Sequence, residues 1–119
     1  MKLPGPDHPI TITPAEGRVV VRFAGVVIAD TRHALELREA SYPAVLYIPR
    51  ADAVMAHYAR TAHSTHCPYK GDASYFDLAA GGAKASNVVW SYETPYPAMA
   101  AIKDHLAFYP QHVTIERSA

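Results

Sequence analysis

The chain has 119 residues, of which half are hydrophobic and 18% are charged. This composition argues against disorder, and the length predicts a single domain over residues 1–119 with a sizeable core. Lysine and arginine balance aspartate and glutamate at 11 each, which removes the electrostatic case for nucleic acid or an anionic membrane as a partner.

The first nine residues contain three prolines and predict a loose lead-in over 1–9. They contain no apolar signal core, and no apolar run in the chain approaches the roughly 20 residues that span a bilayer. The single cysteine, Cys67, cannot close an internal disulfide, and a free thiol is typical of a reducing compartment. We therefore expect a soluble, cytoplasmic protein.

About eight short strands are predicted from the β-branched and aromatic runs that follow. These runs cover residues 18–23, 26–29, 33–39, 44–50, 73–80, 87–93, 107–110 and 112–117. Two short helices are predicted over 50–61 and 96–106. The pattern favours a mainly β domain with a minor helical part, built as an antiparallel barrel or as two packed sheets.

The stretch HSTHCPYKGDASYFD, residues 63–77, gathers most of the candidate chemistry. A thiol becomes a nucleophile only as a thiolate, which requires a nearby base or positive charge. His63 or His66 as base and Lys70 as cation would make Cys67 the nucleophile or redox centre of a thiol-dependent enzyme. The alternative is a buried Cys67 that packs like a small hydrophobic side chain.

A metal site is the second hypothesis for this stretch. His63, His66 and Cys67 offer the nitrogen and sulfur ligands that tetrahedral zinc accepts. Adjacent residues of an extended segment point to opposite faces, however, so His66 and Cys67 would not share one ion. We expect no metal and no cofactor.

A binding pocket is the third hypothesis, because aromatic walls with a few polar groups describe a typical small-ligand site. Arg50 and Lys70 would supply positive charge toward a polar or anionic ligand. The same aromatic residues would equally fill a core with their polar tips at the surface. The predicted ligand-binding residues are Arg50, Tyr69, Lys70, Tyr75, Trp90 and Tyr92.

Five blocks of the sequence, in this order, resemble the bacterial and fungal domain-of-unknown-function family numbered 427 (DUF427). They are VVVRFAGVVIADT, YPAVLYIPRADAV, STHCPYKGDASYFD, NVVWSYETPYPAM and LAFYPQHVTI. The resemblance covers about residues 10–117. By motif position it singles out Arg50, Cys67, Pro68, Tyr69, Lys70, Gly71, Tyr75, Trp90, Tyr92 and Pro95.

The resemblance implies a fold similar to the β-tent group, which includes methionine sulfoxide reductase B and the ligand-binding domain of cereblon. Relatives in that group carry a structural zinc on paired CxxC knuckles, which a chain with one cysteine cannot form. They also carry an aromatic-lined pocket on the sheet. The activity that the resemblance implies is unknown.

The leading hypothesis is therefore a small domain that binds an unknown small molecule in an aromatic-lined pocket on its sheet. A thiol-dependent enzyme with Cys67, His66 and Lys70 as catalytic residues is the first alternative, and a protein-interaction module is the second. Whether the protein is an enzyme stays open. Exposed edge strands would be covered by a homodimer.

Overall fold

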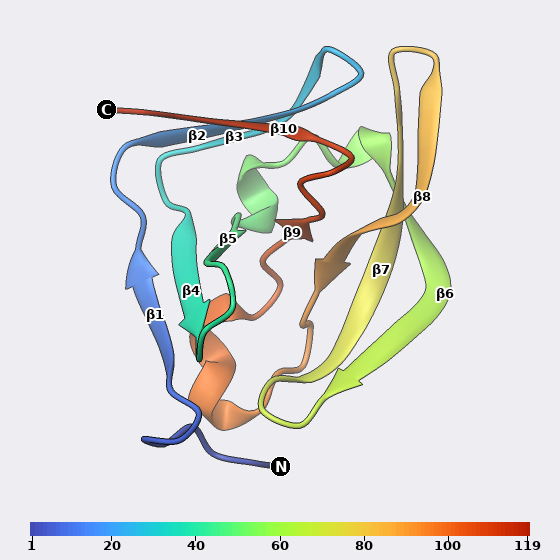
Figure 1. The fold of residues 1–119 in the computed structure, drawn as a ribbon. Coiled ribbons are helices and arrows are strands. Elements are labelled where there is room, and N and C mark those ends of the chain that lie inside the picture. Colours follow the sequence, from blue (N-terminus) through green and yellow to red (C-terminus); the bar gives the residue numbers. More distant parts are fainter.

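The fold is mainly β, as the sequence predicts. The computed structural model describes all residues, 1–119, as ten strands and three short 3₁₀ helices (Figure 1). Every strand pair is antiparallel. The helices are far too short to cross a membrane.

The ten strands form three small sheets. The first has the order β1-β4-β5, with the bounds Ile10–Pro14, Leu35–Glu39 and Val45–Tyr47. The second has the order β10-β2-β3, with the bounds Thr114–Ser118, Arg18–Phe23 and Val26–Thr31. The third has the order β6-β7-β8-β9, with the bounds Tyr58–Cys67, Gly71–Ala80, Ala83–Ser91 and Ala107–Phe108.

The sequence prediction misses two strands, β1 and β6. The predicted helix over 50–61 is replaced by the 3₁₀ turns Arg50–Asp52 and Met55–His57, after which β6 begins at Tyr58. A helix of two or three turns is marginal by itself. Residues 58–60, the end of the predicted helix, instead pair with β7 as the start of β6. Tertiary pairing therefore overrides the local helical pattern.

The second predicted helix is also shorter than expected. The 3₁₀ helix Pro97–Ile102 is kinked at Met99 and begins with proline, whose missing N–H costs nothing in a first turn. Met99 and Ile102 are buried, so this short segment closes one end of the core. In Figure 1 it lies below β4, at the N-terminal end of the molecule.

Two hydrophobic clusters fill the interior. The larger lies among β2, β3, β7, β8 and β9. The smaller lies between the β1-β4-β5 sheet and the β6-β7-β8-β9 sheet. Its buried members are Leu37, Tyr47, Ala73, Tyr75, Tyr92, Met99, Ile102 and Ala107. This second cluster is rich in tyrosine, and it forms the base of the candidate site.

The N-terminal residues lie against the turn that joins β6 to β7. The Lys2 backbone N–H donates to the Pro68 carbonyl at 2.7 Å. The His8 ring stacks on Tyr69, with ring centroids 4.1 Å apart. Two residues of the predicted lead-in, Lys2 and His8, thus contact the CPYKG stretch.

Candidate functional site

The segment Trp90-Ser91-Tyr92-Glu93 supplies both faces of the candidate region. Successive side chains of an extended chain point to opposite faces. Trp90 lies opposite Tyr75 of β7, and Ser91 lies opposite Ser74. Trp90 and Tyr75 therefore share one face of the sheet, and Ser91 and Ser74 share the other.

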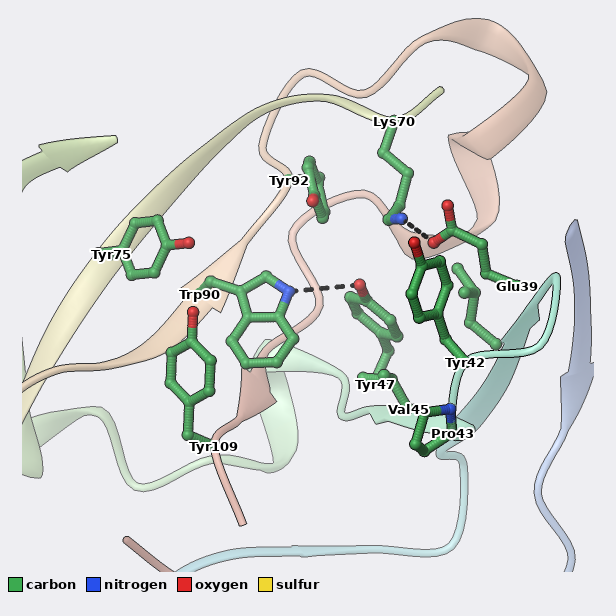
Figure 2. A pocket seen from close by; sticks show the side chains of 11 residues that line it. Glu39, Tyr42, Pro43, Val45, Tyr47, Lys70, Tyr75, Trp90, Tyr92 and Tyr109 are labelled. Atoms are coloured by element: carbon green, nitrogen blue, oxygen red, sulfur yellow. Dashed lines mark hydrogen bonds and ion pairs between the residues drawn. The ribbon is translucent and has the colours of Figure 1, made fainter. Parts of the chain in front are cut away.

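The aromatic face opens into a cavity of about 230 Å³ (Figure 2). Strands β4, β5, β7 and β8 contribute to its walls, together with the β4–β5 loop. The lining residues are Leu37, Glu39, Tyr42, Pro43, Val45, Tyr47, Lys70, Tyr75, Trp90, Tyr92 and Tyr109. The walls are thus five tyrosines, one tryptophan and a few apolar side chains, with one acid and one base.

The acid and the base form an ion pair. Lys70 Nζ donates to Glu39 Oε1 at 2.5 Å, and the two side chains are only 9% and 15% exposed. The other Glu39 oxygen, Oε2, lies 2.7 Å from His8 Nε2. Burial opposes the charge of Glu39, but hydrogen bonds from Lys70 and His8 outweigh it and lower the pKa of the carboxyl. Glu39 is therefore ionised at neutral pH.

Lys70 is directed into the cavity by its neighbours. Gly71 follows it with φ near +107°, a conformation that a side chain would strain. The Lys70 ammonium also lies 5.9 Å from the centroid of the Tyr92 ring. The turn, the carboxylate and the ring together fix this charge at the inner end of the cavity.

The tyrosine hydroxyls provide neutral polar groups along the walls. Trp90 Nε1 donates to Tyr47 Oη at 3.3 Å, and Tyr75 Oη lies 3.0 Å from Thr65 Oγ1. Burial raises the pKa of Tyr47 and of Tyr92 well above the usual tyrosine value. Burial also raises the pKa of Tyr109, to about 12. The hydroxyls of Tyr47, Tyr92 and Tyr109 therefore stay protonated at neutral pH, and a protonated hydroxyl can donate a hydrogen bond.

The cavity brings together four of the six predicted ligand-binding residues: Lys70, Tyr75, Trp90 and Tyr92. Tyr69 and Arg50 lie outside its lining. Tyr69 is occupied by its stacking on His8. Arg50 begins a 3₁₀ turn and belongs to the opposite face of the sheet, where it meets Glu93.

Arg50 takes part in a closed polar network around Glu93. Its guanidinium donates to Glu93 at 3.1 Å, to Ser91 Oγ at 3.0 Å and to the Asp104 carbonyl at 3.2 Å. Arg60 also donates to Glu93, at 2.8 Å. Hydrogen bonding from Arg60 is the main reason that the pKa of Glu93 falls to about 2. This network holds β6, β8 and the 3₁₀ turn together.

The predicted catalytic residues do not form a cysteine–histidine pair. Cys67 is half-buried and packs against the tyrosine-rich cluster. The preceding residue, His66, is exposed, and its Nδ1 lies 2.7 Å from Asp72 Oδ1. His63 lies four residues from Cys67 along β6, roughly 13 Å away at the rise of an extended strand, and it contacts Tyr75. Neither histidine is placed to take a proton from the Cys67 thiol.

Sequence reasoning missed Glu39, Tyr47 and Tyr109. The alternation of the fourth strand contained a signal for Glu39, because Leu37 and Glu39 are two residues apart and share a face. A carboxylate on the core-facing side of a strand needs a hydrogen-bond donor or a counter-charge. Lys70 supplies both to Glu39. Nothing local marks Tyr47 or Tyr109, which reach the cavity only through sheet packing.

The fold and the site define a small mainly β domain with an aromatic-lined cavity that contains one buried ion pair. Comparison with family models then places the chain directly. It belongs to the family described as a domain of unknown function (DUF427), whose model matches residues 11–119. The comparison with curated proteins finds no match.

Proposed function

We propose that the chain binds a small, uncharged polar molecule in the cavity, with the polar group of the ligand against Lys70 and Glu39. The observation that carries this proposal is the ion pair at the inner end of an aromatic-lined hollow. Sites for small molecules typically combine apolar and aromatic walls with a few convergent polar groups.

The hydrogen-bonding capacity of the pair supports the proposal. A lysine ammonium has three N–H donors, and Lys70 uses one of them, toward Glu39. The two that remain suit an acceptor on the ligand. Glu39 receives one hydrogen bond at each oxygen and retains lone pairs for a donor. A head group with an acceptor beside a donor, such as a carboxamide, matches both residues.

The charge of the pair favours an uncharged ligand over an anionic one. The lysine charge is already balanced by a carboxylate 2.5 Å away. An anion bound to Lys70 would lie next to Glu39 and would be repelled by it. Arg50, the second cation expected from the sequence, is bound to Glu93 on the other face and does not offset this repulsion.

Titration with butanamide and with butyrate tests the proposal. The chain has one tryptophan, so the Trp90 indole N–H gives a single resonance that reports on the cavity wall. Millimolar butanamide is expected to move this resonance, and butyrate at the same concentration is expected to move it much less. Equal shifts, or no shift with either probe, would overturn the proposal.

A pair of lysine variants localises the effect. Lys70→Met removes the ammonium donors from the cavity, and its butanamide response is expected to vanish. Lys84→Met is the matched control, because Lys84 is exposed on β8 and outside the lining. The dispersion of the backbone amide resonances shows whether each variant is folded. The preference of the unmodified protein for amide over carboxylate tests the same idea without any substitution.

A further inference from the structure

A second hollow adjoins the cavity. It has a volume of about 370 Å³ and lies between the β4–β5 loop and the segment that leads from β9 into β10. Its lining residues are Tyr42, Pro43, Ala44, Val45, Leu46, Trp90, Phe108, Pro110 and Ile115. None of them is charged. We call this hollow the apolar groove.

The apolar groove and the cavity are neighbours with a common wall. Four residues line both: Tyr42, Pro43, Val45 and Trp90. Tyr42 is 66% exposed at this junction. Figure 2 shows Tyr42, Pro43 and Val45 together on one side of the cavity, with Tyr47 between them and Trp90.

The size of each hollow bears on the ligand. Sites for drug-sized molecules usually enclose about 300 to 1,000 Å³. The cavity, at about 230 Å³, is smaller than that range. The cavity and the apolar groove taken together fall within it. A ligand of ordinary size that places its polar group at Lys70 therefore extends along Trp90 into the groove.

Polarity changes along this path in one direction. The inner end has the Lys70–Glu39 pair, the middle has tyrosine hydroxyls and the indole of Trp90, and the outer end is lined by apolar side chains apart from Tyr42, which lines both hollows. From this gradient, and resting on the proposed function, we infer that the ligand is an uncharged amphiphile. Its polar head occupies the cavity, and its alkyl or aryl tail occupies the apolar groove.

A homologous series of primary amides, from butanamide to octanamide, tests the inference. Each methylene buried in the groove is expected to tighten binding about fourfold until the groove is filled. Dissociation constants come from the shift of the Trp90 indole resonance. Affinity that does not depend on chain length would overturn the amphiphile inference, even though butanamide binding itself would leave the proposed function standing. If no amide binds, both fail.

A matched pair of alanine variants separates groove from cavity. Ala44 is exposed and lines only the groove, so Ala44→Asp is expected to abolish the chain-length dependence and to leave butanamide affinity unchanged. Ala101, exposed on the 3₁₀ helix Pro97–Ile102, lies outside both hollows, and Ala101→Asp is the control. A retained chain-length dependence in Ala44→Asp would contradict the inference.

A second copy of the chain is the other molecule that could occupy the apolar groove. Sedimentation at the protein concentration of the titrations tests for it. A monomer with chain-length-dependent affinity supports the amphiphile. A dimer that Ala44→Asp dissociates and Ala101→Asp does not would assign the groove to an interface and overturn the inference.

Discussion

Two charged networks occupy opposite faces of the β7–β8 pair, and they differ in how completely the protein satisfies them. On the outer face, Glu93 receives hydrogen bonds from Arg50, Arg60 and Ser74. On the cavity face, Lys70 contacts a single carboxylate and keeps two N–H donors free. The outer network is closed within the fold, whereas the cavity pair has capacity for another molecule.

The two networks also contain the two cations that the sequence analysis assigned to the same ligand site. Arg50 and Lys70 both stand near aromatic residues, and both were expected to face a ligand. Arg50 instead spans the network and lies over Phe76, 5.3 Å from the ring centroid. A planar guanidinium with five donors can bind several fixed acceptors of the protein at once. A lysine ammonium is a compact charge, which can bind a single ligand group at a cavity.

The largest expected effect comes from removing one half of the cavity pair. Glu39→Gln leaves the buried Lys70 charge without a counter-charge, and we expect a loss of about 3 kcal/mol in the free energy of unfolding. Urea denaturation at pH 7 measures it. The double variant Glu39→Met with Lys70→Met removes both charges and is expected to recover most of the loss. A double variant as unstable as Glu39→Gln would show that the pair is not the cause.

The outer network is expected to contribute less, and to do so in a pH-dependent way. The pKa of Glu93 is about 2 in the folded protein, below the ordinary 4.5, so its stabilisation is full above pH 4.5 and is lost as the pH falls through 2. Glu93→Gln is expected to cost about 1.5 kcal/mol at pH 7, after allowance for solvent screening at the exposed end of the network.

Denaturation of the Glu93→Gln variant at pH 7 and at pH 2.5 checks this sign. The gap between variant and unmodified protein is expected to shrink at the lower pH, because at pH 2.5 Glu93 is protonated in the unfolded chain and begins to be protonated in the folded protein. A gap of constant size would mean that the carboxylate charge does not contribute.

A smaller effect is expected for the hydrogen bond between Trp90 and Tyr47 in the cavity wall. Tyr47→Phe removes the acceptor of the Trp90 indole N–H, and because Tyr47 is almost fully buried we expect a loss of about 1 kcal/mol. The Trp90 indole resonance is expected to move at the same time. An unmoved resonance would mean that the 3.3 Å contact is not a hydrogen bond in solution.

The smallest effect is expected on the surface, where neither network reaches. Arg18 forms a two-point ion pair with Asp30, at 2.8 and 2.6 Å, and both side chains are more than 40% exposed. Exposed pairs contribute little because water and salt screen them. Arg18→Ala is therefore expected to leave the urea midpoint unchanged. A clear shift of the midpoint would mean that exposed ion pairs contribute to the stability of this protein.

The sequence predicts those parts of the fold whose signal is local. The alternation of 18–23 and the β-branched run of 26–29 correspond to β2 and β3, and Ala24-Gly25 forms their turn with positive φ at both residues. Strand β6 could not be predicted this way, since its residues are largely exposed and its pairing with β7 is its main support.

The residues of the candidate site likewise divide into those with a local sequence signal and those without one. Trp90 and Tyr92 were predictable as wall residues, because the alternation of one strand puts both on the same face. Glu39 and Lys70 are 31 residues apart, and only the meeting of the first and third sheets brings them together. The opposite placement of Arg50 likewise depends on the turn after β5, for which the sequence has no periodic signal.

The interrupted pairing of β6 has a consequence for how the protein behaves at high concentration. This strand is ten residues long and forms one border of its sheet, so its outward N–H and C=O groups are a template for cross-β stacking. The register shift between Arg60 and Ser64 breaks that template near its middle, and Arg60 adds a charge beside the break. Deleting two of the three residues 61–63 would restore a single register with β7 and give a continuous edge, prone to fibre growth, while the cavity on the far side of β7 kept its walls.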